Sequence, residues 1–173
     1  INGGLGSNTL VFATPGESGC WDNESYGAIS FNLSSELSNA TSFLNIGGGG
    51  NNDTLTGDDN ANVIIGAGGN DTLNGGGGND TIYGDDHLND SSGTIYGIRS
   101  YGITDGNDTI SGGDGDDVIY GDGGDDILDG GAGNDTISSG SGSDTIIITS
   151  STNSDILTDF TDGTDAIGFD NSL

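Results

Sequence analysis

A nine-residue repeat fills the middle of the chain and constrains its fold more than any other feature. Successive units begin at Gly48, Gly57, Gly66 and Gly75, and resume at Gly112, Gly121, Gly130 and Ser139. Each unit has a glycine-rich half followed by a short apolar half. A sequence period of this length is typical of a parallel β-helix or β-roll, in which each unit buries its apolar side chain only by stacking on its neighbours.

Two positions of the unit define its register. The sixth position carries a carboxylate or an amide, at Asp53, Asn62, Asp71, Asp80, Asp117, Asp126, Asp135 and Asp144. The eighth position is always aliphatic, at Leu55, Ile64, Leu73, Ile82, Ile119, Leu128, Ile137 and Ile146. Because side chains alternate along a strand, the eighth residue is expected to point into the interior and its neighbours outward.

The segment 84–111 departs from the simple period. It contains Thr94-Ile95-Tyr96, a copy of Thr81-Ile82-Tyr83, and then Asp108-Thr109-Ile110-Ser111. We interpret it as two units with enlarged turns, since insertions belong in exposed turns. This interpretation adds Asp108 to the sixth-position residues.

The flanks are less regular. Residues 3–11 form an isolated unit with Asn8 at its sixth position, and residues 26–33 alternate as a half-buried strand should. We therefore expect three parts: a small β-rich cap at 1–47, the repeat region at 48–147 with enlarged turns at 84–111, and a capping segment at 148–173.

Composition indicates that something other than a conventional core orders this chain. It has 36 glycines and only 29% hydrophobic residues, and its 28 acidic residues against one basic residue give a net charge of −27. Composition alone predicts disorder, which the repeat argues against. The charge makes nucleic acid and anionic membrane surfaces poor partners and divalent cations the natural counter-charge. No apolar stretch is long enough to insert into a membrane.

The repeat resembles the RTX (repeats-in-toxin) consensus G-G-x-G-x-D-x-U-x, where U is a large aliphatic residue, from about Gly48 to Ile147. The resemblance implies an all-β fold, a parallel β-roll: a two-sheet, right-handed solenoid in which two units make one coil of 18 residues. The segment from Asp155 to Ile167 is similar to the D-x-I-x-D-F-x-x-G-x-D-x-I pattern that closes RTX blocks, and is expected to cover the last coil.

A fold of this kind needs calcium. One buried aliphatic side chain for every nine ordered residues is too little burial to offset the loss of chain entropy. Calcium takes six to eight oxygen ligands, and stacked turns offer carboxylates and backbone carbonyls. With coils about 4.8 Å apart, equivalent aspartates line up in rows along the two edges, where several Ca²⁺ ions would cancel their repulsion.

The resemblance also implies which residues bind the ions. Candidate ligands are the sixth-position residues and the turn glycines, with one variable-position aspartate: Asp53, Asn62, Asp71, Asp80, Asp108, Asp117, Asp126, Asp135, Asp144, Gly66, Gly68, Gly75, Gly77, Gly112, Gly121, Gly123, Gly130 and Asp114. Asn62 offers a weaker ligand than a carboxylate, for which Asp58 or Asp59 would compensate. Solvated surface charge is the simpler interpretation of Asp114, Asp116, Asp122 and Asp125.

Other chemistry is not indicated. His87 is the only histidine and Cys20 the only cysteine, so zinc or iron clusters and an internal disulfide are not expected. Cys20 is either a small buried hydrophobe or an intermolecular link. The sequence has no G-x-S-x-G elbow and no G-K-[ST] phosphate loop, and its carboxylates form a lattice rather than one catalytic pair. We therefore do not expect an enzyme.

The sequence thus predicts a calcium-binding structural or assembly module of a secreted or cell-surface protein. We expect it to fold on calcium binding and to associate head-to-tail with copies of itself into an extracellular filament or matrix. The alternative is a detached C-terminal RTX domain that serves the secretion and folding of a larger secreted toxin, protease, lipase or adhesin.

Overall fold

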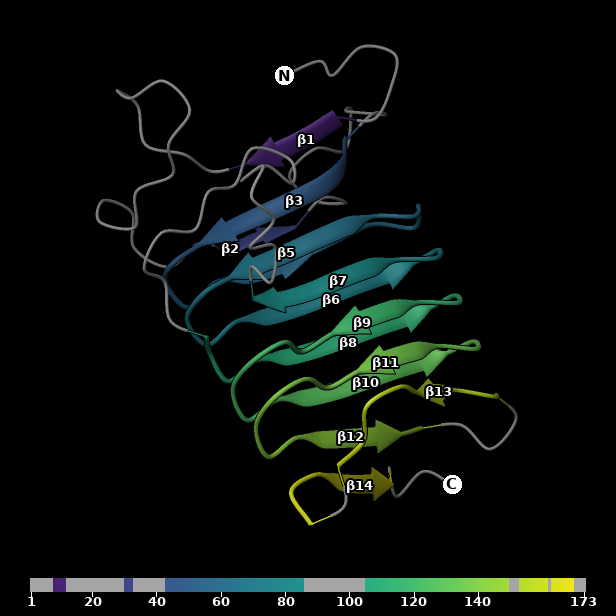
Figure 1. Ribbon diagram of the computed structural model, residues 1–173. Helices are drawn as coiled ribbons and strands as arrows, with labels where there is room; N and C mark the ends of the chain where they lie inside the picture. Colours follow the sequence, from purple (N-terminus) through teal and green to yellow (C-terminus); the bar gives the residue numbers. More distant parts are fainter. Residues whose placement is uncertain are drawn as a thin grey trace.

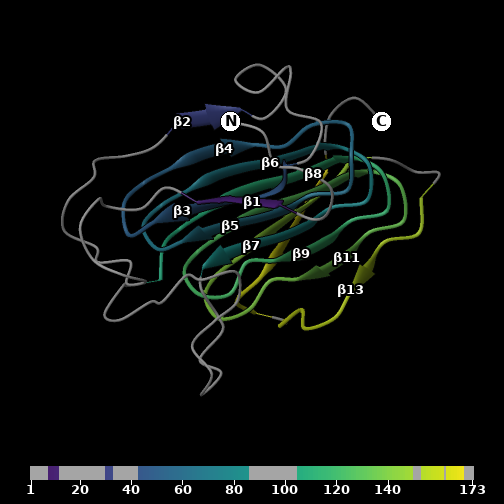
Figure 2. The same ribbon diagram turned by 90° about the horizontal axis from the view of Figure 1, so that it is seen from above.

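Two parallel β-sheets face each other and form a single β-solenoid (Figure 1). The computed structural model describes residues 8–11, 30–32, 43–85, 105–149, 153–161 and 163–169. Within these ranges there is no helix, and hence none that could cross a membrane. Seen from above, the strands of the two sheets lie on opposite sides of a flattened coil (Figure 2).

Successive strands alternate between the sheets. The first sheet contains, in spatial order, β1 (Asn8–Val11), β3 (Phe43–Gly49), β5 (Val63–Ala67), β7 (Thr81–Asp85), β9 (Val118–Tyr120), β11 (Thr136–Ser138) and β13 (Ile156–Leu157). The second contains β2 (Ser30–Asn32), β4 (Thr54–Thr56), β6 (Thr72–Gly77), β8 (Thr109–Asp114), β10 (Ile127–Ala132), β12 (Thr145–Ile148) and β14 (Ala166–Phe169). The all-β, two-sheet roll is therefore confirmed.

The register of the strands follows the repeat. Ile46 pairs with Ile64 and Leu55 with Leu73, so equivalent residues one coil apart are separated by 18 positions. In a typical strand such as Thr54–Thr56, only the central residue is buried, as side-chain alternation requires. One coil thus consists of two units on opposite sides of the interior.

The core is a double stack of eighth-position side chains. All are 1% exposed or less: Ile46, Leu55, Ile64, Leu73, Ile82, Ile110, Ile119, Leu128, Ile137 and Ile146. Phe31, Ile148 and Leu157 pack against this stack. The eighth-position residues predicted to be inside are therefore buried wherever the structure describes their side chains.

Both flanks extend the same roll. At the N-terminal end β1 pairs with β3 and β2 pairs with β4, so the unit that contains Asn8 has a neighbouring coil and is not isolated. At the C-terminal end β13 pairs with β11 and β14 with β12, so residues 153–169 add further strands beyond Ile147. Cys20 lies outside the described residues, as does most of the segment 1–42.

The segment 84–108 forms one unit rather than the two that the sequence suggested. β8 pairs directly with β6, and Ile110 lies opposite Leu73 in the second sheet. Each unit moves the chain from one sheet to the other, so two units after β7 would have placed Ile110 in the first sheet. Thr94-Ile95-Tyr96 and His87 lie outside the described residues, and no strand separates β6 from β8.

We predict that replacing one core side chain weakens the whole roll. Ile119 is fully buried at the centre of the stack, so Ile119→Ala should lower the free energy of unfolding in saturating calcium by about 2–5 kcal/mol. Urea unfolding followed by circular dichroism measures this change. Thr109→Ala, on an exposed outer position, is the control. Equal losses in the two variants would contradict the assignment of the core.

Candidate metal sites

The sixth-position residues stack along the two edges of the roll. The first row precedes the strands of the second sheet and contains Asp53, Asp71, Asp108, Asp126, Asp144 and Asp165. The second row precedes the strands of the first sheet and contains Asn62, Asp80, Asp117, Asp135 and Asp155. The expected rows of carboxylates therefore exist.

Each carboxylate uses one oxygen to join neighbouring coils. The backbone N–H of Asp53 donates to Oδ1 of Asp71 at 2.7 Å, and that of Asp71 donates to Oδ1 of Asp108 at 2.7 Å. In the second row, Asp80 N–H donates to Oδ1 of Asp117 at 2.7 Å, and the same bond recurs along both rows at up to 3.2 Å. Oδ1 thus already accepts a hydrogen bond from the backbone.

The second carboxylate oxygen has no hydrogen-bond partner at seven of these positions. The buried, unpartnered Oδ2 atoms belong to Asp71, Asp80, Asp108, Asp117, Asp126, Asp135 and Asp144. A buried acceptor without a donor is expensive, and for an ionised carboxylate the penalty is larger still. These oxygens need a cation or a proton.

The first glycine of each unit leaves the space that these oxygens face. A Cβ atom on Gly66 would collide with Oδ2 of Asp71 and with the carbonyl oxygen of Gly84. The same arrangement recurs with the carbonyls of Gly66, Gly75, Gly112, Gly121, Gly130 and Ser139. Carboxylate and carbonyl oxygens thus converge where a side chain is missing.

Burial controls the protonation of the rows. It raises the pKa of Asp71 and Asp126 to about 8 and that of Asp80 to about 7. It raises the pKa of Asp108 and Asp117 to about 6. In each case the hydrogen bond from the backbone N–H lowers the pKa, while the charges of neighbouring carboxylates raise it. Lys, Arg and His do not occur in the described ranges, so no side-chain cation there offsets the charge.

The donor set fits a hard, divalent cation. No three acidic, histidine or cysteine side chains among the described residues gather closely enough to hold an ion by themselves, so a cation at these oxygens would also need backbone carbonyls. Calcium accepts irregular shells of carboxylate and carbonyl oxygens, whereas magnesium demands near-ideal geometry and keeps its waters. The unpartnered Oδ2 atoms and the open spaces at the glycines therefore fit calcium.

The other candidate ligands fall into two groups. Gly66, Gly75, Gly112, Gly121 and Gly130 are first-position glycines whose carbonyls face the rows. Gly68 and Gly77 donate their N–H groups to the carbonyls of Gly49 and Asp58 in the preceding coil, and Gly123 donates to Asp85. Asp114 is exposed on the edge of the roll that carries the second row.

Asn62 has a local partner that stands beside its amide. The N–H of Asp58 donates to Oδ1 of Asn62 at 2.8 Å, and Nδ2 of Asn62 lies 3.4 Å from Oδ1 of Asp58. A carboxylate therefore lies next to the neutral side chain, and its role as a calcium ligand stays a prediction. Asp59 is exposed.

The sequence interpretation missed two sixth-position aspartates. Asp155 accepts the N–H of Asp135, and Asp165 accepts that of Asp144. Both stand two residues before an aliphatic residue, Leu157 and Ile167, and this D-x-U spacing was the available signal. Asp144 therefore does not end its row.

A second set of side chains, at the fifth position, was also missed. Here the N–H of Asn70 donates to Oδ1 of Asn52 at 3.1 Å, and that of Asp125 donates to Oδ1 of Asn107 at 3.0 Å. Asp116 similarly accepts the N–H of Asn134 at 2.8 Å. Asp116 and Asp125 are thus parts of an exposed ladder, whereas the sequence suggested only solvated charge.

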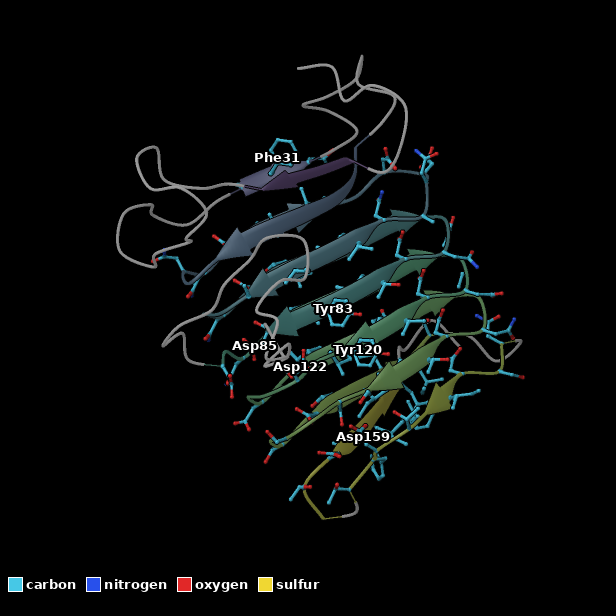
Figure 3. The ribbon with its side chains drawn as sticks, turned by 45° about the horizontal axis from the view of Figure 1, so that its top comes forward. Phe31, Tyr83, Asp85, Tyr120, Asp122 and Asp159 are labelled. Atoms are coloured by element: carbon cyan, nitrogen blue, oxygen red, sulfur yellow. The ribbon has the colours of Figure 1, made fainter. Side chains whose placement is uncertain are left out.

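At the C-terminal end, Asp159 binds the turn that follows β11. Its Oδ1 accepts the N–H of Ser139 at 2.8 Å, and its Oδ2 accepts the N–H of Gly140 at 2.9 Å and the hydroxyl of Ser138 at 2.8 Å (Figure 3). Ser139 stands where other units have their first glycine. A carboxylate thus ties this turn to the next coil.

Comparison with known families agrees with this geometry. The chain matches the family model of the RTX calcium-binding nonapeptide repeat (4 copies) over residues 47–82, 103–137 and 119–146. These ranges contain the sixth-position residues from Asp53 to Asp80 and from Asp108 to Asp144. No curated protein matches the chain.

We predict that the calcium-free chain is more stable in acid than at neutral pH. Because the folded pKa values of the row aspartates lie above their ordinary value of 3.8, the folded state binds protons more tightly than the unfolded state. The resulting stability is complete below about pH 4 and is lost as the pH rises through 6 to 8.

Circular dichroism of metal-depleted protein between pH 4 and pH 8 measures this dependence. We expect β-structure to decrease as the pH rises, and millimolar calcium to restore it at pH 8. Metal-free protein with constant β content over this range would contradict the prediction.

Proposed function

We propose that this chain, a calcium-binding structural module that carries RTX calcium-binding nonapeptide repeats, folds when calcium binds. We further propose that it works outside the cell as part of a secreted or cell-surface protein. The observation that carries this proposal is the set of seven buried, unpartnered Oδ2 atoms in the two rows. Five of them face a backbone carbonyl of the next coil, those of Asp71, Asp80, Asp108, Asp117 and Asp126. Calcium would satisfy both oxygens at once.

The proposed ligands are the row carboxylates and the first-position carbonyls. Asp71, Asp80, Asp108, Asp117, Asp126, Asp135 and Asp144 provide the Oδ2 atoms, with Asp53, Asn62, Asp155 and Asp165 in the terminal coils of the rows. The carbonyls of Gly66, Gly75, Gly84, Gly112, Gly121, Gly130 and Ser139 complete the shells from the adjacent coil. In this proposal residues 1–47 and 148–173 cap the region 48–147, and the C-terminal cap adds Asp155 and Asp165 to the ends of the two rows.

Metal binding and folding form one equilibrium in such a module. Each ion has ligands from two coils, and these ligands are close together only when the coils are stacked. Without calcium, the net charge of −27 opposes compaction. Extracellular calcium-binding modules typically have dissociation constants of about 10⁻⁴–10⁻³ M, so the chain would fold only after leaving the calcium-poor cytoplasm.

We predict that calcium drives folding and that a row aspartate matters more than a variable-position one. Asp117→Ala removes a buried row carboxylate, whereas Asp114→Ala removes an exposed carboxylate three positions earlier. A calcium titration followed by circular dichroism should show a higher midpoint and lower cooperativity for Asp117→Ala, and little change for Asp114→Ala. Wild-type protein with the same β content in excess chelator and in millimolar calcium would refute calcium-driven folding.

We further propose head-to-tail self-association through the ends of the roll. β13 and β14 are the outermost strands at the C-terminal end, and β1 and β2 at the other. The C-terminal coil exposes apolar side chains, with Ile156, Ile167 and Phe169 at 59%, 44% and 70% exposure. Open strand edges template pairing with another chain, and a heterologous contact that does not close builds a filament.

We predict that assemblies grow only when calcium is present and that their growth depends on Ile167 in the last coil. Light scattering in millimolar calcium should show growth that chelator reverses, and Ile167→Asp should abolish it. Ile127→Asp is the matched control, because Ile127 is equally exposed at 43% but lies in the middle of the second sheet. A monodisperse monomer across micromolar concentrations would rule out the assembly.

A further inference from the structure

Two neighbouring turns of the first edge carry a carboxylate at the second position as well as at the sixth. The first of these turns begins at Gly84 and ends at Asp108, and the inserted segment 86–104 lies within it. Asp85 closes the strand β7, and Asp122 holds the equivalent place one coil later, since Tyr83 pairs with Tyr120. Figure 3 shows Asp85 and Asp122 close together at this edge. We call Asp85, Asp108 and Asp122 the neck cluster.

Asp85 joins both ends of the inserted segment to the next coil. Its carboxylate accepts the N–H of Gly106 at 3.2 and 3.3 Å and that of Gly123 at 3.4 Å. Its side chain is nevertheless 3% exposed. Burial, together with the charge of Asp108, raises the pKa of Asp85 to about 7. A buried carboxylate therefore stands at the neck of the segment without a nearby side-chain cation among the described residues.

Asp108 provides the unpartnered oxygen of this cluster. Its Oδ2 has no hydrogen-bond partner, and the residue is 1% exposed. A Cβ on Gly84 would meet that oxygen and the carbonyl of Gly121. Gly84 and Gly121 are the residues directly before Asp85 and Asp122. The open position for a cation thus adjoins both additional carboxylates.

The charge at this place is unusual within the roll. The second position of the other described units is neutral, at Gly49, Ala67, Gly76, Gly113, Gly131 and Gly140. The exception is Asp58, whose unit has the neutral Asn62 at the sixth position. The neck alone therefore combines two second-position carboxylates with a sixth-position one. Calcium affinity rises with the negative charge of the site.

We propose that the neck cluster forms the tightest calcium site of the roll and that the ion bound there fastens both ends of the segment 86–104. Asp85 and Asp122 act through their charge and need not contact the ion directly. This inference rests on the proposed calcium-dependent folding. It adds that calcium occupies the coils unequally and that the inserted segment is fixed at its base at lower calcium concentrations than those that fold the remaining coils.

Terbium luminescence tests the first part. Terbium is an oxygen-seeking stand-in for calcium, and nearby tyrosines sensitise it. Tyr83 and Tyr120 stack with ring centroids 4.9 Å apart, directly before Gly84 and Gly121. In the wild type, tyrosine-sensitised emission should appear at lower terbium concentrations than full β-structure. Asp85→Asn and Asp122→Asn should each raise the concentration for half-maximal emission about tenfold.

Asp116→Asn is the control, because it removes the same charge from an exposed position on the opposite edge, where an asparagine can accept the same backbone N–H. It should leave the emission curve unchanged. Circular dichroism in saturating calcium shows whether each variant folds. If Asp85→Asn does not fold, Asp122→Asn still tests the proposal. Equal curves for all three variants, in protein that still folds with calcium, would overturn the inference. Wild-type protein that calcium does not fold would instead overturn the proposed function.

Cleavage by trypsin tests the fastening. Arg99 is the only Lys or Arg of the chain, so trypsin cuts only within the inserted segment. The cleavage rate should fall as calcium fills the neck, and Asp85→Asn should need about tenfold more calcium for the same protection. Asp116→Asn should match the wild type. A cleavage rate that does not depend on calcium, or protection unaffected by Asp85→Asn, would overturn the fastening.

Discussion

The two oxygens of each row carboxylate have different roles, and this difference is the constraint on which the rest of the structure depends. One oxygen accepts a backbone N–H from the preceding coil and sets the spacing of the coils, while the other is buried without a hydrogen-bond partner. The first oxygen can hold its place only if the second is neutralised. The fold therefore requires a cation or a proton at the second oxygen, which the described protein groups do not supply.

Glycine and the thin core both follow from this constraint. The oxygens need room, so the first position of the unit lacks a side chain wherever a carbonyl from the next coil must approach. With half of each unit given to turns, only one side chain per unit is left to fill the interior. The exposed fifth-position ladder adds hydrogen bonds that run in the opposite sense, from the later coil to the earlier one. These bonds require no metal.

Much of this architecture could be predicted from the sequence, because the two informative positions of the unit have different chemistry. Ile64 and Leu73 had to be inside and Asp71 and Asp80 had to align, given the period. The number of units in 84–108 could not be obtained in that way, since Thr94-Ile95-Tyr96 satisfies the same local pattern as a true strand. Only the pairing of Ile110 with Leu73 decides it. Asp155 was missed because its unit lacks the glycines that mark the others, and the fifth-position ladder because asparagine and aspartate serve there interchangeably.

The long turn also shows that the roll accommodates an insertion without a change in its coils. Asp71 and Asp108 are 37 residues apart instead of the usual 18, so the turn holds 19 additional residues, yet their hydrogen bond is 2.7 Å, the same as that between Asp53 and Asp71. Closing a flexible loop becomes only slowly less favourable with length, by about 0.6 kcal/mol for each doubling. Evolution can therefore lengthen one turn without disturbing the coils on either side. The roll is a scaffold that can display a peptide at a chosen height along its axis, and the same property makes its turns suitable places for grafting.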